Sequence, residues 1–309
     1  MKKHYRAVEY VIFFVALSAM AALLFDAAHY SDVVVDALKT WAFNVLPCLF
    51  PYFVFSSVIT NLDCTKRIAK IFLPFADFYR LNPVGGYVFF LNLVSGYPIG
   101  VKTACDLKTQ NFISLNECED ICSSCNFAGC GFVLGTVAVF FNSVKIALII
   151  YASVVAGALI NGLIFLPKKN SFKNQIDFKK TPLSPSLLSD SIYSAAQSII
   201  NVGATIIVFC ILAEIFTRFL PDNSTSKIIF KGIIEMTSGI KAAAAMQNTF
   251  FGVLFTCFFV SFGGLCVFMQ CFVFWQKAGV NAFKMLAKKT TQAVVSVVVC
   301  LILYIVFID

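Results

Sequence analysis

Long apolar runs alternate with short polar segments along nearly the whole chain. A transmembrane helix needs about 20 mostly apolar residues, and windows of that kind occur seven times. They cover 8–28, 33–62, 120–142, 144–166, 190–219, 249–274 and 290–308. Because lipid offers no water to unpaired backbone groups, the pattern predicts a helix in each window.

Two further apolar windows, 82–104 and 228–247, are interrupted near the middle. The first contains Ser-Gly-Tyr-Pro at 95–98, and the second contains Glu-Met-Thr-Ser-Gly at 235–239. Glycine and proline at mid-segment are typical of kinked spans or of re-entrant hairpins. The pattern of apolar residues alone leaves both alternatives open.

The basic residues favour the hairpins. Lysine and arginine gather in four segments, 2–6, 66–80, 168–180 and 277–289. If both interrupted windows return to the side that they left, all four segments face the cytoplasm, as the positive-inside rule expects. Full spans would instead place the five lysines of 168–180 outside. We therefore predict two hairpins and a cytoplasmic N-terminus.

This topology contains two copies of one unit, in which a span, a hairpin and two more spans follow each other. The copies occupy 33–166 and 190–309, the second inverted, with a basic cytoplasmic linker at 167–189 between them. Short fragments recur in the same order: NVLP (44–47) and NVGA (201–204), SGYP (95–98) and SGIK (238–241), CNFAGCG (125–131) and VSFGGLC (260–266). The predicted fold class is an all-α polytopic membrane protein with an inverted-topology repeat, re-entrant hairpins and discontinuous helices.

Residues 1–32 combine basic residues, an apolar run and small residues near Ala27. This pattern fits either a retained N-terminal transmembrane helix, which could serve as a signal anchor, or a cleaved signal peptide. The apolar run is long for a signal peptide, which favours the retained helix.

Composition supports the membrane assignment. Hydrophobic residues make up 59% of the 309 residues and charged ones 13%, with a mean hydropathy of +0.84, whereas soluble domains carry about 25% charged residues. The net charge of +8 lies in short loops without a basic patch, so we expect a lipid bilayer and no nucleic acid as partner. The sequence has no HExxH, GxSxG or Walker motif, so we expect no enzyme activity and no cofactor.

The candidate binding site lies at the four predicted helix breaks, 95–100, 126–131, 235–239 and 261–264. An opened helix exposes N–H groups and a positive dipole end, which suit an anionic or hydrogen-bonding solute. Inverted repeats with broken helices are typical of secondary transporters that bind a small molecule near the middle of the bilayer. The candidate residues are Asn126, Ser261, Ser95, Gly96, Lys102, Thr237, Ser238, Gly129 and Gly263.

Several of these residues have a second interpretation. Asn126 and Ser261 can contact solute or cap the following half-helix. Lys102 and Lys241 can attract an anion or reach the membrane interface. Glu235 can bind a coupling ion, Na⁺ or a proton, or lie at an exposed hairpin end.

The twelve cysteines include a group at Cys118, Cys122, Cys125 and Cys130. Spacings of four and three place the first three on one helical face. A metal site there needs a further ligand, and the two histidines, His4 and His29, are distant in sequence. We therefore predict reduced, buried thiols and no metal.

The motifs NVLPCLFPYFVFSSVI (44–59), SGYPIGVK (95–102), CNFAGCGFVLGTV (125–137), EMTSG (235–239) and SFGGLCVFMQ (261–270) resemble those of the sporulation integral membrane proteins of the YlbJ type. These proteins are grouped with nucleoside-recognition or gate domains, as found in ferrous-iron transporters, and are similar to concentrative nucleoside transporters. Three positions depart from the family pattern, which has asparagine, proline and asparagine where Phe127, Cys130 and Ser238 stand.

The resemblance implies a multi-pass protein of a bacterial membrane, the outer forespore membrane, that moves dipicolinate during sporulation. Paired positive helix ends and Lys102 would suit that aromatic dianion. Two alternatives remain: a non-transporting assembly factor of the spore envelope, and a nucleoside or nucleobase carrier. The substrate, the coupling ion and the oligomeric state are not predicted by the sequence.

Overall fold

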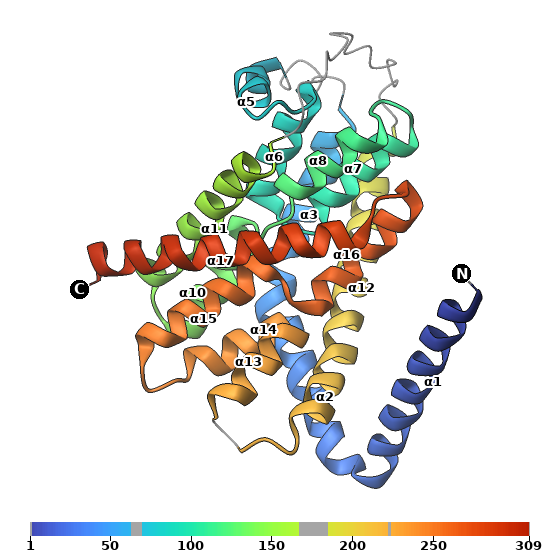
Figure 1. The fold of residues 1–309 in the computed structure, drawn as a ribbon, viewed down its shortest axis with the longest axis vertical. Coiled ribbons are helices and arrows are strands. Elements are labelled where there is room, and N and C mark those ends of the chain that lie inside the picture. Colours follow the sequence, from blue (N-terminus) through green and yellow to red (C-terminus); the bar gives the residue numbers. More distant parts are fainter. Residues whose placement is uncertain (1, 63–69, 167–184, 222–223, 309) are drawn as a thin grey trace.

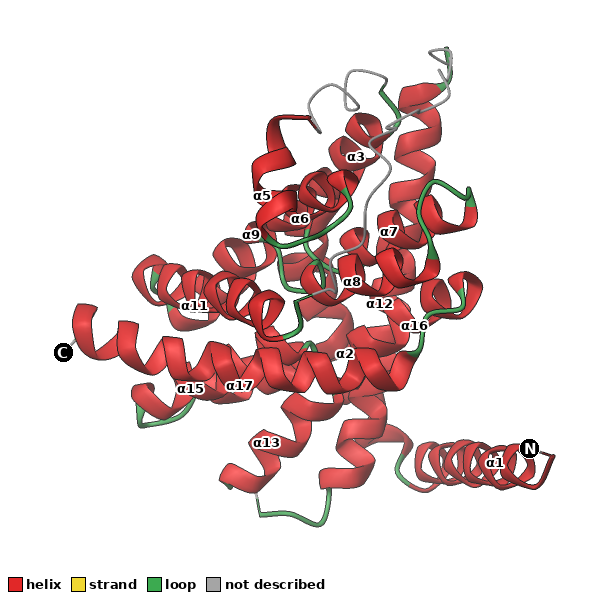
Figure 2. Ribbon diagram, turned by 45° about the horizontal axis from the view of Figure 1, so that its top comes forward, coloured by secondary structure: helices red, strands yellow, loops and turns green. Residues whose placement is uncertain are grey.

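The computed structural model describes residues 2–62, 70–166, 185–221 and 224–308. Its regular elements are all helices in these ranges, drawn red in Figure 2. Five helical stretches are long and apolar enough to cross a membrane: Ala27–Ile59, Val144–Ile164, Leu187–Thr217, Thr249–Ala278 and Ala282–Phe307. The protein is an all-α, multi-pass integral membrane protein, as the apolar windows predicted. Two of the seven predicted spans, 8–28 and 120–142, instead contain shorter apolar helices, Ile12–Phe25 and Cys130–Phe141.

The first predicted copy begins with a long helix in which a π-helical turn separates two α-helical parts. A short pair of helices then leads into a hairpin, a broken span and an unbroken span. The elements are α2 (Ala27–Thr40), η1 (Trp41–Val45), α3 (Leu46–Thr60), η2 (Lys70–Phe72), α5 (Leu73–Phe78), α6 (Pro83–Ser95), α7 (Ile99–Thr109), α8 (Leu115–Ser124), α9 (Cys130–Phe132), η3 (Val133–Val137), α10 (Ala138–Phe141) and α11 (Val144–Ile164).

The second predicted copy has the same order of elements with simpler spans. It consists of α12 (Leu187–Thr217), α13 (Thr225–Ile234), α14 (Met236–Ala244), α15 (Thr249–Phe262), α16 (Gly264–Ala278) and α17 (Ala282–Phe307). The linker predicted at 167–189 lies mostly outside the described residues. The division into two copies, and the orientation of each copy in a bilayer, stay predictions.

Corresponding elements of the two copies pack against each other. The first spans meet where α2 and α3 contact α12, and the last spans meet where α11 contacts α17. In Figure 1, α17 crosses the middle of the molecule beside α11 and α15. The hairpin α6–α7 contacts α16, and α14 of the other hairpin contacts α10. Each hairpin therefore lies against the broken span of the opposite copy.

The π-helical turns η1 and η3 lie side by side. The Thr136 hydroxyl donates a hydrogen bond of 3.1 Å to the Asn44 carbonyl oxygen. A π turn changes the pairing of backbone groups within a helix, and such turns are frequent at functional sites. Here a side chain of one turn contacts the backbone of the other, which fixes α3 against the broken span.

The first helix, α1 (Lys2–Phe25), stands apart from the bundle in Figure 1 and contacts α2 and α12. Arg218 at the end of α12 pairs with Asp26 at a distance of 2.5 Å between Nη2 and Oδ2. Large apolar side chains along α1 are exposed, Phe14 and Leu24 among them. Such a surface suits contact with lipid.

Candidate functional site

The helices break at all four predicted positions. In the first copy α6 ends at Ser95 and α7 starts at Ile99, and α8 ends at Ser124 before α9 starts at Cys130. In the second copy α13 gives way to α14 at Glu235, and α15 gives way to α16 at Gly263. The predicted interruptions are thus confirmed as real ends of helices.

Glycines with positive φ angles make two of these breaks possible, Gly96 at the first and Gly263 with Gly264 at the last. Gly96 has a φ of +71° and Gly263 a φ of +84°. L-amino acids with a Cβ rarely adopt such angles. Each glycine turns the chain directly after a helix, so that the next half-helix starts in a new direction.

The first hairpin and the broken span of the first copy touch backbone to backbone. The Tyr97 amide donates to the Phe127 carbonyl oxygen at 3.0 Å, and the Asn92 side-chain amide donates to the same oxygen at 3.2 Å. A Cβ added to Gly129 would lie 2.5 Å from both the Gly96 nitrogen and the Val94 oxygen. The two breaks therefore satisfy each other's polar backbone groups.

Tyr97 also connects this pair of breaks to the second copy. Its hydroxyl lies 2.8 Å from the Met236 sulfur and donates to the Val260 carbonyl oxygen at 3.1 Å. The Gly264 Cα lies against the start of α14, where an added Cβ would be 3.1 Å from the Met236 nitrogen. All four breaks consequently meet around the Tyr97 side chain, a residue that the sequence did not single out.

A buried cavity of about 30 Å³ lies at this meeting point. Most of the residues that line it are apolar, and the polar side chains among them are those of Ser95, Tyr97, Glu235, Thr237 and Gln270. Its volume is that of about one water molecule in the liquid. The described conformation is therefore closed around its centre.

A second, more polar cleft of about 110 Å³ reaches from the surface to the same place. Its outer part holds the ion pair of Asp36 and Lys241, in which the Lys241 Nζ lies 2.7 Å from Oδ2. Glu235 and Thr237 line both the cleft and the inner cavity. Together with Ile206, which also lines both, these residues separate the exposed cleft from the inner cavity.

Glu235 caps the half-helix that follows it. Its carboxylate accepts hydrogen bonds from the Thr237 amide at 2.9 Å and the Ser238 amide at 2.6 Å. Glu235 is 1% exposed. It therefore does not lie at an exposed hairpin end, which was the second interpretation of this residue in the sequence. Among the described residues no lysine or arginine forms a salt bridge with it. A buried carboxylate without a basic partner is expensive and points to a function.

A buried basic side chain, that of Lys289, lies on the other side of Tyr97. The sequence counted it with the loop charges of 277–289, but α17 begins at Ala282 and buries Lys289 to 5% exposure. Its ammonium donates to the Asn126 carbonyl oxygen and lies 5.0 Å from the centre of the Tyr97 ring. The described part of the chain offers it no carboxylate within salt-bridge distance.

Lys289 starts a polar stripe along the buried face of α17. One and two turns further along lie Gln292 and Ser296, both fully buried. Ser296 shares a hydrogen bond of 2.9 Å with Ser261, and both amide atoms of Gln292 lack a partner among the described residues. The stripe connects the break at Asn126 with the break at Ser261. Gln292, at its centre, has no hydrogen-bond partner for its side-chain amide among the described residues.

The remaining predicted residues take varied positions. Asn126 and Ser261 do not cap the next half-helix, because Gly129 and Gly263 are the N-terminal caps and make no side-chain cap. Ser238 lines the cleft. Lys102 donates to the Ser194 hydroxyl at 3.3 Å, away from the cavity lining.

The sequence did not predict Tyr97, Gln292 and Lys289 as site residues, because single polar residues in apolar windows carry little signal.

Fold and site together define a multi-pass membrane protein in which four helix breaks meet around Tyr97 and a small cavity. A curated relative supports a narrower assignment: the chain is 27% identical over 206 residues to the sporulation integral membrane protein YlbJ of Bacillus subtilis. The match covers 59% of this chain, which spans about half the length of that relative. This chain is thus similar, over part of its length, to a sporulation integral membrane protein of the YlbJ type, which its motifs also resemble.

Two other comparisons add no relatives. No family model matches the chain, and no solved structure matches it.

Proposed function

We propose that this protein works as a secondary transporter that moves a small anionic solute across a bacterial membrane during sporulation. One observation carries the proposal: Lys289 is buried without a carboxylate partner at the point where the helix breaks meet. A buried ammonium costs several kcal/mol in free energy. A negatively charged solute would supply the missing counter-charge.

The surroundings of Lys289 support the same interpretation. Gln292 offers two amide atoms that lack partners in the described part of the chain, and an unsatisfied buried polar group costs about 1–3 kcal/mol. A solute that bonds to Gln292 and Lys289 would satisfy both groups, and the centre would have to open further to reach them, because neither residue lines the cavity or the cleft. Dipicolinate, the aromatic dianion implied by the family resemblance, has the carboxylates for such contacts.

Transport requires a conformational change. The inner cavity of about 30 Å³ is roughly tenfold smaller than the 300 Å³ at the low end of pockets for organic ligands. The described conformation would be the occluded one, with the 110 Å³ cleft as the outer approach. Movement of the hairpin tips at Tyr97 and Glu235 would open the centre to that cleft.

Uptake by proteoliposomes tests the proposal. The full-length protein should accumulate labelled dipicolinate, and Lys289→Met should reduce uptake to the level of empty vesicles. Lys284→Met is the matched control, because Lys284 lies on the same helix but is exposed and pairs with Glu119 at 3.2 Å. Uptake that is equal in Lys289→Met and Lys284→Met would contradict an anion site at Lys289.

The small cavity also favours a second candidate, a non-transporting factor in spore envelope assembly. In that case the broken helices would be structural, and the purified protein would move no solute. A sporulating strain that carries Lys289→Met separates the two candidates. If the protein is a transporter, its spores contain less dipicolinate but assemble a normal envelope. If the protein is an assembly factor, their envelope is disturbed.

A further inference from the structure

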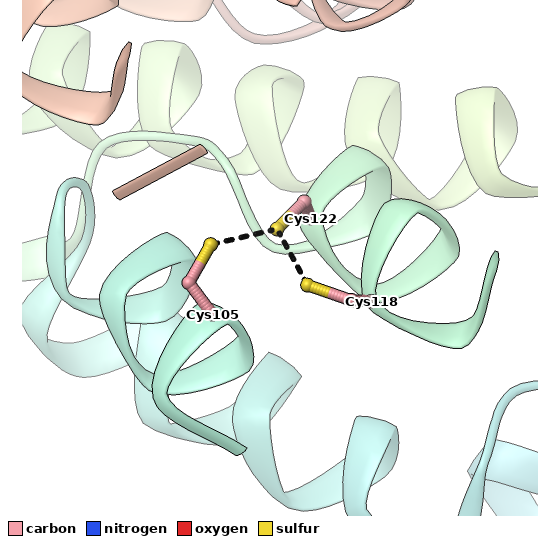
Figure 3. A group of neighbouring side chains, drawn as sticks. All are labelled: Cys105, Cys118 and Cys122. Carbon is pink, nitrogen blue, oxygen red and sulfur yellow. Dashed lines mark hydrogen bonds between the residues drawn. The ribbon is translucent and has the colours of Figure 1, made fainter. Parts of the chain in front are cut away.

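A buried group of three cysteines lies outside the proposed solute site. Cys105 belongs to α7, and Cys118 and Cys122 belong to α8. Figure 3 shows the three thiols pointing toward one another from the two helices. All three residues are buried, with exposures of 2% or less. Cys125, which the sequence placed with Cys118 and Cys122, ends α8 and is not in the group.

The spacing of the sulfur atoms fits a single metal ion. Cys122 Sγ lies 4.0 Å from both Cys105 Sγ and Cys118 Sγ, and all three sulfurs are within 4.8 Å of each other. An ion at the centre of a triangle with sides of about 4.0–4.8 Å lies about 2.3–2.5 Å from each corner. The usual zinc–thiolate distance is about 2.3 Å.

The donor set selects the class of metal. Thiolates are soft ligands that favour Cu(I) and Zn²⁺ over hard cations. Within the described residues no histidine, aspartate or glutamate joins the group. The Ala104 carbonyl oxygen also lies near the group and accepts a hydrogen bond from Cys118 Sγ at 3.5 Å.

Weak thiol contacts alone give little reason for three cysteines to converge. A thiol is a weak donor and otherwise behaves as a small hydrophobic group. We propose that Cys105, Cys118 and Cys122 bind one soft cation, Cu(I) or Zn²⁺, which fastens α7 to α8. The break that contains Tyr97 directly precedes α7, and the break that contains Asn126 directly follows α8. The ion would therefore hold both breaks in place.

The predicted topology places residues 105–122 near the cytoplasmic side, where thiols stay reduced. This condition keeps all three thiols free of disulfides, and they become thiolate ligands as the metal ion displaces their protons. The proposal itself does not depend on solute transport, because it concerns the geometry of the three sulfurs only.

Metal binding by the full-length protein in detergent tests the site. The protein is loaded with Cu(I) or, separately, with Zn²⁺, and retained metal is measured after competition with a chelator. We expect one equivalent per chain, with Cys105→Ser, Cys118→Ser and Cys122→Ser each losing more than the 10–100-fold in affinity that outer-shell changes cost. Cys125→Ser is the matched control, since Cys125 is also buried at the end of α8.

X-ray absorption on the wild-type protein gives a test that needs no variant. Three sulfur neighbours at about 2.3 Å from the ion would support the site. The proposal is overturned if neither metal is retained, if Cys125→Ser loses as much metal as Cys118→Ser, or if the isolated protein holds a disulfide between two of the three cysteines.

Discussion

The Lys289 ammonium on α17 donates a hydrogen bond to the Asn126 carbonyl in the break between α8 and α9. This contact joins the last span of the second copy to the broken span of the first. It also places a positive charge 5.0 Å from the centre of the Tyr97 ring, at the meeting point of both hairpins.

Lys289→Met should separate stability from function. The change removes a buried ammonium, which costs several kcal/mol to desolvate, and leaves one carbonyl group unpaired, which costs about 1–3 kcal/mol. We expect a melting temperature equal to or above that of the wild type, measured in detergent, although solute uptake is lost. A clear fall in melting temperature would show that Lys289 is mainly structural.

Gln292→Leu should also maintain or raise the stability of the protein while it lowers solute uptake. Leucine removes two buried amide atoms that lack partners among the described residues, so the protein should become more stable by about 1 kcal/mol or more. Uptake should fall, because a ligand of the solute is gone. Ser153→Ala on α11 is the control, since the Ser153 hydroxyl already bonds to the Ile149 carbonyl oxygen of its own helix.

Gly129→Ala should damage the contact between the first two breaks. The new methyl group would lie 2.5 Å from backbone atoms of Gly96 and Val94, and no change of rotamer can relieve a backbone clash. We expect a loss at or above the upper end of the usual 1–3 kcal/mol for overpacking, seen as a lower melting temperature. Gly162→Ala meets side chains instead, the Tyr79 ring at 3.1 Å and the Ser124 hydroxyl at 3.7 Å, and should cost less.

Glu235 is expected to couple an ion to transport. Glu235→Gln keeps an oxygen that can cap α14 but removes the charge, so uptake should lose its dependence on Na⁺ or on pH. Asp36→Asn in the outer cleft, which is exposed, should keep that dependence. If uptake by Glu235→Gln and by the wild type depends equally on both ions, Glu235 has no coupling role.

Glu117 connects two helix caps and should make stability depend on pH. Burial raises the pKa of its carboxyl, but hydrogen bonds from the Asn82 side chain and from Ser114 outweigh burial and hold the pKa below its ordinary value. A carboxyl with a lowered folded-state pKa stabilises the protein above its ordinary pKa of about 4.3, and this contribution is lost as the pH falls through the folded value. Melting temperatures measured from pH 7 to pH 3 should therefore fall less in Glu117→Gln than in the wild type.

Much of the architecture follows from local patterns in the sequence. Long apolar runs predict spanning helices because lipid requires every backbone group to pair within the helix. The interruptions at Gly96 and Gly263 predict breaks because glycine adopts positive φ angles, as found there, far more readily than other residues. Both signals lie within a few residues of the feature that they predict, so the order of spans, hairpins and breaks could be read from the chain.

The chemistry of the centre depended on contacts between distant segments. Lys289 follows a short polar loop and resembles a lysine at the membrane interface, and only the packing of α17 against the Asn126 break buries it. The cysteine group likewise needed Cys105 from the hairpin beside Cys118 and Cys122. Periodicity reports which residues share a helix face, but the tertiary structure decides which faces meet. The sequence by itself therefore determined where the helices break, and the tertiary structure decided which side chains those breaks bring together.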